Sequence, residues 1–142
     1  MDNLSREESE RFLDDQTIGR LGCHHQGVTY VVPLIYAREG DALYVLTMEG
    51  QKVLFARQNP SVCFEVDEYD AATGNWRSVI VQGRYEELDS DGKARAIAIL
   101  GKRHGSRRGS SSTDGPPPPP PRPVVAFCIR VEHVTGRVMK RS

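Results

Sequence analysis

The sequence is poor in the features that mark secreted, membrane-spanning or nucleic-acid-binding proteins. Its cysteines, Cys23, Cys63 and Cys128, are odd in number and none belongs to a CxxC pair, which argues against a disulfide framework or a zinc ribbon. No apolar run approaches the roughly 18 residues that a membrane span requires, and no apolar segment follows basic residues at the N-terminus. The 19 basic and 19 acidic side chains cancel, so no overall field attracts nucleic acid or an anionic membrane. We therefore expect a cytoplasmic protein with buried free thiols and no nucleic-acid or membrane partner.

Familiar catalytic and metal-binding motifs are also missing. The chain contains no GxSxG, HExxH, GxGxxG or complete P-loop pattern, so catalysis by protein side chains alone has little support. Cys23-His24-His25 resembles a metal cluster at first sight. Adjacent residues of a strand point to opposite faces, however, so these three side chains cannot meet on one ion without a bulge. We predict no metal site.

The pattern that is present indicates one mainly β domain that covers residues 1–142. Ser5 and Glu8 match a capping box, which predicts a helix at the N-terminus. Further along, apolar and polar residues alternate in short runs separated by turn residues, as in antiparallel hairpins. Closing such a meander removes its exposed edges, so we expect a small closed or split β-barrel with flanking helices. The predicted strands cover residues 18–23, 28–37, 42–47, 62–68, 76–88 and 124–134, and the predicted helices cover residues 5–14, 51–58 and 89–103.

The same periodicities predict which side chains face inward. The carboxylates Glu65, Asp67 and Glu68 alternate along a strand near a turn, and we interpret them as a solvated face. The inward-facing residues are predicted to be Val53, Leu54 and Phe55 in helix 51–58, Val62, Phe64 and Val66 in strand 62–68, and Ala94, Ile97, Ala98 and Gly101 in helix 89–103.

Residues 105–123 lose this periodicity. The segment combines a Ser/Arg/Gly-rich stretch with six consecutive prolines, a composition too polar to fold on its own. We predict a flexible loop that contains a polyproline II segment. Residues 117–122 also satisfy a PxxPxR pattern that an aromatic groove could read, but a run of proline satisfies that pattern automatically, and a semi-rigid linker is the better interpretation.

The segment Leu-Thr-Met-Glu-Gly-Gln-Lys-Val-Leu-Phe, residues 46–55, passes from a predicted strand to a predicted helix. A helix N-terminus presents unpaired N–H groups and a partial positive charge, so Gly50 and Lys52 at this place would suit a phosphate. The alternative is a solvated turn with an ordinary surface lysine. Taken alone the segment favours the solvated turn, because a single Gly-x-Lys is much weaker evidence than a complete P-loop.

The order of the segments along the chain instead favours a phosphate site at residues 46–55. Four stretches, IGRLGCHHQGVTYVVPLIY, ALYVLTMEGQKVLFARQNPSVCFEVDE, WRSVIVQGRYEEL and VVAFCIRVEHVTGR, together resemble the pyridoxamine 5′-phosphate oxidase-like split barrels. Within them the chain is similar to the branch that includes the nitroimidazole-resistance (Nim) proteins. The resemblance implies a six-stranded antiparallel split barrel that forms a homodimer and binds FMN in clefts at the dimer interface.

The resemblance also implies a set of cofactor-binding residues. Lys52 corresponds to a phosphate-binding lysine, Gln51 stands where many members carry arginine, and Thr47 would meet the same phosphate. Losing one basic residue at position 51 would cost the phosphate a contact worth about 1–2 kcal/mol unless another group compensates. Ser78 stands where oxidases carry a glutamine near the flavin, on a strand that Trp76 opens. The full predicted set is Val31, Val32, Pro33, Leu34, Thr47, Gly50, Gln51, Lys52, Trp76 and Ser78, with Val31–Leu34 along the isoalloxazine ring.

Two functional hypotheses follow from the resemblance. The first is an FMN-dependent oxidoreductase that reduces a small molecule such as a nitro-aromatic compound. The second is a non-catalytic module that holds or senses a flavin, or a haem through His24, His25 or His133; relatives use FAD, deazaflavin or haem. A scaffold that has lost its cofactor is a third. Vitamin B6 oxidation is not expected, because the C-terminal TGRVMKRS lacks the tryptophan and arginine of true pyridoxamine phosphate oxidases.

Overall fold

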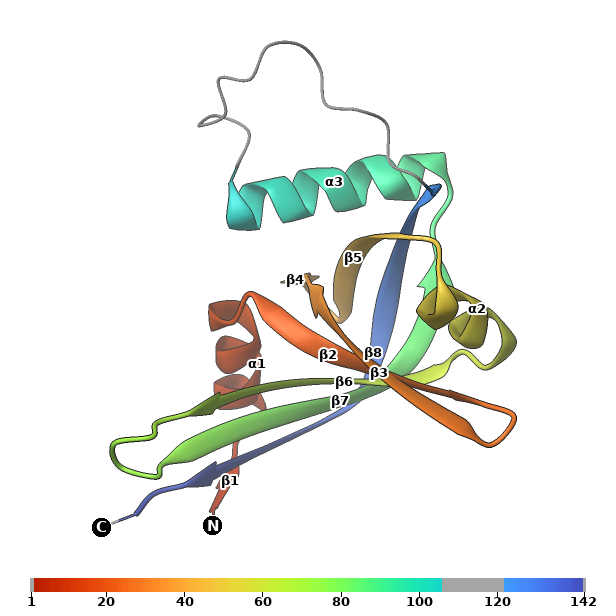
Figure 1. Ribbon diagram of the computed structural model, residues 1–142. Helices are drawn as coiled ribbons and strands as arrows, with labels where there is room; N and C mark the ends of the chain where they lie inside the picture. Colours follow the sequence, from red (N-terminus) through yellow and green to blue (C-terminus); the bar gives the residue numbers. More distant parts are fainter. Residues whose placement is uncertain (1, 106–121, 142) are drawn as a thin grey trace.

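A computed structural model describes residues 2–105 and 122–141 (Figure 1). The predicted flexible loop therefore falls largely outside the described residues. The described part forms a curled antiparallel sheet with helices at its connections, and none of its helices is long and apolar enough to cross a membrane. The strands are β1 (Asp2–Leu4), β2 (Ile18–His25), β3 (Val28–Ile35), β4 (Ala37–Glu39), β5 (Ala42–Met48), β6 (Ser61–Tyr69), β7 (Trp76–Glu87) and β8 (Val124–Met139), and the helices are α1 (Arg6–Asp15), α2 (Gln51–Gln58) and α3 (Ser90–His104).

The strand order is β3-β2-β6-β7-β8-β5-β4, with β1 paired to β8, and every pairing is antiparallel. The long β8 joins the two halves, because its first part pairs with β5 and most of its length pairs with β7. β3 and β4 are the two edges, so the sheet is a split barrel and is not closed. This confirms the predicted fold class.

The described residues hold eight strands, so the predicted number of six was wrong. One extra strand is β1, too short and polar to show periodicity. The other arises because the predicted strand 28–37 divides at Tyr36, which is buried and turns inward. Its phenolic hydroxyl donates to the Leu13 carbonyl of α1, and its backbone N–H donates to the Thr17 carbonyl at 3.3 Å. These bonds separate β4 from β3 and direct it toward β5.

Two apolar clusters hold the sheet and its helices together. The larger one fills the inside of the curled sheet and includes Val62, Phe64 and Val66, which face inward as predicted. The smaller one lies between α3 and strands β5 and β8 and contains Tyr44, Ala96 and Cys128. In Figure 1, α3 crosses the end of the barrel above this second cluster.

The helices confirm the predicted positions but not all of the predicted faces. α1 begins with the predicted capping box, in which Ser5 Oγ accepts from the Glu8 N–H at 3.0 Å and Glu8 accepts from the Ser5 N–H at 2.9 Å. α2 covers the predicted residues and buries Val53, Phe55 and Ala56. The prediction for Leu54 was wrong, because this side chain is 50% exposed.

The predicted inward stripe of α3, Ala94, Ile97, Ala98 and Gly101, was also wrong. Ala96 is the buried residue of this helix, and Ile97 is exposed. Polar anchors at both ends fix the rotation of α3. Lys93 Nζ donates to the Val124 carbonyl at 3.3 Å, and the His104 ring lies 2.7 Å from the Tyr36 carbonyl oxygen.

Candidate functional site

The junction between β5 and α2 contains four of the predicted site residues. Thr47 lies at the end of β5, half-buried, and Gly50 is the N-cap of α2. The N–H groups of Val53 and Leu54 both donate to the Gly50 carbonyl at 3.1 Å. No side chain caps this helix and no acidic residue lies in its first turn, whereas α1 is capped by Ser5 and α3 by Asp89. The positive end of α2 is thus left open to an anion.

Two basic side chains add to the positive charge at this end. Lys52 is half-buried, and burial, followed by the nearby Arg122 guanidinium, lowers the pKa of its ammonium. Arg122 Nη1 lies 3.5 Å from the position that a Cβ on Gly50 would occupy. The guanidinium therefore lies beside Gly50 at the start of α2. This donor set, two cations and an uncapped helix end, is suited to a phosphate.

The predicted ring-binding segment Val31–Leu34 lies on β3, an edge strand. Val32 and Leu34 pack against the inner cluster, while Val31 and Pro33 point outward and are exposed. In the described chain β3 pairs only with β2, so one edge of its backbone has no strand partner. α2 packs next to it, because the Phe55 ring lies 5.9 Å from the Tyr30 ring. The structure therefore brings this segment and the α2 end to the same side of the barrel.

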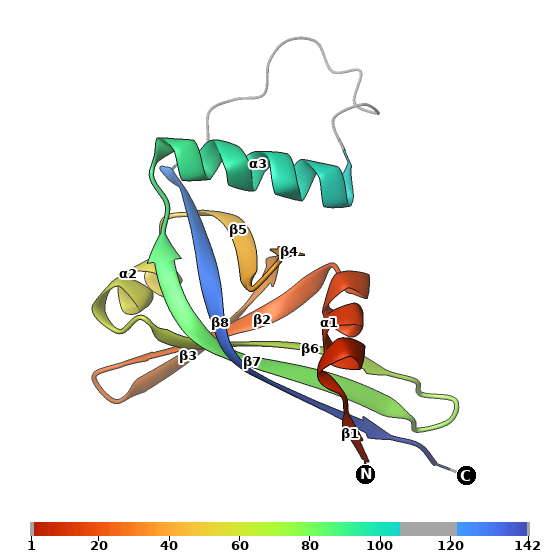
Figure 2. The same cartoon turned by 180° about the vertical axis from the view of Figure 1, so that it is seen from behind.

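Trp76 and Ser78 lie elsewhere. Both belong to β7 at its hairpin with β6, where Trp76 pairs with Tyr69 and Ser78 pairs with Asp67. Figures 1 and 2 show this hairpin projecting from the side of the sheet opposite to α2. Within this chain these two residues are not brought together with Lys52.

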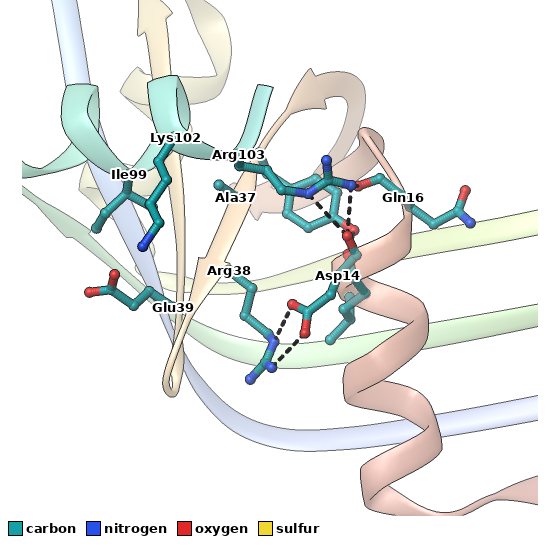
Figure 3. A pocket seen from close by; sticks show the side chains of 10 residues that line it. Asp14, Gln16, Ala37, Arg38, Glu39, Ile99, Lys102 and Arg103 are labelled. Carbon is teal, nitrogen blue, oxygen red and sulfur yellow. Dashed lines mark hydrogen bonds and ion pairs between the residues drawn. The ribbon is translucent and has the colours of Figure 1, made fainter. Parts of the chain in front are cut away.

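A hollow of about 410 Å³ between α1, β4 and α3 contains none of the predicted site residues (Figure 3). Three of its polar residues, Asp14, Arg38 and Arg103, are engaged with one another. Arg38 donates to both carboxylate oxygens of Asp14 at 2.8 Å, and Arg103 donates to the Asp14 carbonyl at 2.7 and 3.0 Å. Arg103 thus satisfies a carbonyl at the C-terminal end of α1. We interpret this hollow as the joint that ties α1 to α3 and β4.

The histidines are scattered in the described chain. His24 Nδ1 lies 3.0 Å from the Thr29 hydroxyl, and the His25 ring packs edge-on against Phe55 at 5.9 Å. His133 is exposed on β8, where it pairs with Gln82. Residues 2–105 and 122–141 contain no group of three His, Cys, Asp or Glu side chains that could hold a metal ion.

Of the β6 carboxylates predicted to form a solvated face, Asp67 and Glu68 are exposed as predicted, but Glu65 is half-buried. Glu65 is only 30% exposed at its side chain and lies beside Arg20 and Asp67 on the outer face of the sheet. Burial, reinforced by a hydrogen bond with Asp67, raises the pKa of Glu65 to about 7. The prediction missed this because the packing of β6 between β2 and β7 is not visible in the local sequence.

Comparison with known proteins identifies the family. The sequence model described as pyridoxamine 5′-phosphate oxidase matches residues 5–138. The chain belongs to the pyridoxamine 5′-phosphate oxidase family. The chain is also 31% identical over 140 residues to an uncharacterized protein of Rhizobium meliloti (strain 1021). The alignment covers 94% of this chain and 92% of the relative.

Solved structures of similar proteins share the fold of this family member. A FAD-binding protein of Mesorhizobium loti is 34% identical, with a TM-score of 0.76 and 98% of each chain covered. A candidate 5-nitroimidazole antibiotic resistance protein of Bacteroides thetaiotaomicron is 21% identical, with a TM-score of 0.77, covering 96% of this chain and 86% of the other. A FAD- and haem-binding protein of Mycobacterium smegmatis is 16% identical, with a TM-score of 0.70, covering 94% and 71%. The last two show the fold alone.

Arg122 is the residue at the α2 end that sequence reasoning did not find. Its position at the end of the proline run suggested only a PxxPxR pattern. The signal lies in strand pairing: Val124 of β8 pairs with Met48 of β5, which brings residues 122–123 next to residues 49–50. In this family member, a basic residue just before the last strand thus reaches the strand-to-helix junction.

Proposed function

We propose that this protein binds a flavin nucleotide, with the phosphate at the N-terminal end of α2 and the isoalloxazine ring along the free edge of β3. The observation that carries the proposal is the positive N-terminal end of α2, where Lys52 and Arg122 lie and the helix has no acidic cap. The Mesorhizobium loti protein, which is described as FAD-binding and is similar over its full length, adds support.

The chain's own residues would bind and orient the cofactor. Lys52 would neutralise phosphate charge, the Thr47 hydroxyl would donate to a phosphate oxygen, and the first N–H groups of α2 would donate as well. The unpaired backbone edge of Val31–Leu34 would face the polar edge of the ring. A bound flavin would supply electron transfer, for which the protein side chains have no equivalent. FMN satisfies this arrangement with its terminal phosphate, and FAD with its diphosphate.

The reaction that we propose is the two-electron reduction of a small molecule, with a nitro-aromatic compound as the class to test first. Fold similarity to the Bacteroides protein supports this choice at the level of fold only. The competing function is a flavin holder without turnover. Steady oxidation of NADH or NADPH coupled to loss of an added nitro-aromatic compound would support the reductase, and its absence from a flavin-loaded protein would favour the holder.

We also propose that the protein is a homodimer with the cofactor at the interface. This would account for the separation of Trp76 and Ser78 from Lys52, since the β6–β7 hairpin of a second subunit could approach the α2 end of the first. Under this proposal Trp76 and Ser78 contribute to the flavin site across the interface.

The first test of the flavin site is the substitution Lys52→Ala. We expect the affinity for FMN, measured by flavin fluorescence quenching, to fall about 10- to 100-fold, because one charge-assisted contact to the phosphate is lost. The affinity for riboflavin, which lacks the phosphate, should not change. Lys140→Ala is the matched control, because Lys140 is exposed at the other end of the molecule. A Lys52→Ala protein that binds FMN as tightly as the wild type would refute the site.

A further inference from the structure

Arg122 is held next to the start of α2 by backbone contacts on both sides of the junction. The Glu49 N–H donates to the Pro123 carbonyl at 2.9 Å. One residue further on, Val124 pairs with Met48, and its carbonyl accepts from Lys93 Nζ at 3.3 Å. These contacts fix the path of residues 122–124 beside β5 and α2. The pairing of the backbone therefore places Arg122 at the junction.

The guanidinium lies against the one residue of the junction that has no side chain. Arg122 Nη1 would be 3.5 Å from a Cβ at Gly50, which is ordinary contact distance. Gly50 has φ −176°, an extended conformation that any residue can adopt, so the backbone does not require glycine here. A methyl group at this position would also meet the guanidinium at ordinary contact distance, so the observation places Arg122 beside Gly50 without requiring glycine.

The acidic residues of the described chain leave the charge of Arg122 unneutralised. Glu49, the acidic residue next to Gly50 in the sequence, is engaged with Arg57 at 2.8 Å. In the described part of the chain, neither Arg122 nor Lys52 lies within ion-pair distance of a carboxylate. Eight other arginines of the described strands and helices do pair with carboxylates: Arg6, Arg11, Arg20, Arg38, Arg57, Arg77, Arg95 and Arg130.

The pKa of Lys52 reflects the same excess of positive charge. Burial and the charge of Arg122 both lower the pKa of its ammonium. The other nearby group is the Cys23 thiol, whose pKa is raised by burial, so it stays neutral and offers no negative charge. Half-buried Lys52 and exposed Arg122 are two like charges held close together, and an anion with two negative charges would relieve their repulsion.

We infer that Arg122 and Lys52 together bind the phosphate of the flavin nucleotide, so that Arg122 provides the second positive charge that Gln51 cannot. This inference rests on the proposed flavin-binding function and adds a binding residue to it. A phosphate monoester near neutral pH carries close to two negative charges and matches the two cations. The guanidinium can donate two parallel hydrogen bonds to one phosphate, which an ammonium cannot.

The test compares Arg122→Gln and Arg122→Lys with the wild type, using FMN, FAD and riboflavin as probes. We expect Arg122→Gln to weaken FMN binding about 10- to 50-fold, to leave riboflavin binding unchanged and to reduce the dependence of FMN affinity on salt. Arg122→Lys should lose less, because it keeps the charge. Arg11→Gln, which removes an exposed arginine from α1, is the matched control and should have no effect.

A rescue experiment separates binding from folding. Adding Gln51→Arg to Arg122→Gln places a cation at the first residue of α2 and should restore most of the FMN affinity. Equal FMN affinities of Arg122→Gln and the wild type would overturn the inference, and so would a parallel loss of riboflavin binding, which would indicate a structural role. A wild-type protein that binds none of the three flavins would instead overturn the proposed function.

Discussion

At the scale of single residues, Glu65 shows how packing changes the chemistry of a side chain. The pKa of this carboxyl is raised to about 7 by burial and by its hydrogen bond with Asp67, while Arg20 acts in the opposite direction. In the unfolded chain the group returns to its ordinary value of 4.5. Between these two values the folded state binds more protons than the unfolded state, so the free energy of unfolding falls as pH rises from about 4.5 to about 7.

Substitution Glu65→Gln should remove this pH dependence. At pH 8 we expect the variant to be more stable than the wild type by about 1 kcal/mol, a value reduced for the solvent that reaches the group. Well below pH 4.5 the two proteins should converge, because Glu65 is then protonated in both the folded and the unfolded wild type. Urea denaturation at the two pH values measures the difference.

A control of opposite sign is Glu86→Gln. The hydrogen bond from Arg130 lowers the pKa of Glu86, so ionised Glu86 stabilises the fold above its unfolded value and loses this effect as pH falls. Glu86→Gln should therefore be less stable than the wild type at pH 8. An unchanged pH dependence in Glu65→Gln would show that the Glu65 proton is not taken up on folding.

At the scale of elements, local sequence patterns located the helices and most strands because their signals lie within a few residues. The capping box of Ser5 and Glu8 and the limits of α2 are such local signals, and both were confirmed. The division between β3 and β4 was not predictable in this way. It depends on the hydrogen bond of Tyr36 to α1, a contact between residues 23 positions apart.

The candidate site also combines residues that a local sequence pattern predicts with one that depends on strand pairing. Thr47, Gly50, Gln51 and Lys52 follow one another in the chain, so one sequence segment was enough to place them at a strand-to-helix junction. Arg122 joins them through the pairing of β8 with β5, which no local pattern records. The roles of all these residues in binding stay predictions.

The wrongly predicted face of α3 leads to a prediction about its stability. Gly101 was predicted to face the core, but it is exposed, and a Cβ added there would meet nothing within 4 Å. Gly101→Ala should therefore raise the free energy of unfolding by about 0.5–1 kcal/mol, because alanine restricts the unfolded chain and favours the helix. Thermal or urea denaturation would measure it.

Gly19→Ala is the matched contrast. A Cβ at Gly19 would lie 2.1 Å from the Phe64 ring and 2.9 Å from the Glu65 carbonyl oxygen, inside the barrel. This substitution should lower the free energy of unfolding by about 1–3 kcal/mol through overpacking. Destabilisation by Gly101→Ala as well would mean that α3 packs through this face, as the sequence pattern had indicated.

At the scale of the whole molecule, the outer face of the sheet carries several exposed apolar side chains. The exposed side chains of Ile18, Val31, Ile35 and Ile80 lie on β2, β3 and β7, and they surround the pair of Arg20 and Glu65. Exposed apolar groups gathered on one face are typical of protein interfaces. This face is the surface on which we expect the proposed homodimer to form, because a second copy would cover it symmetrically.

Substitution Val31→Glu tests that surface. Val31 is 62% exposed, so the fold should tolerate a carboxylate there, while a dimer would have to bury it next to its counterpart. We expect the wild type to elute as a dimer in size-exclusion chromatography with light scattering, and the variant as a folded monomer with weakened flavin binding. Ile97→Glu, on the exposed side of α3, is the control and should remain dimeric. A monomeric wild type that still binds flavin would place the cofactor within one subunit, whereas a dimeric Val31→Glu protein would move the interface to another face.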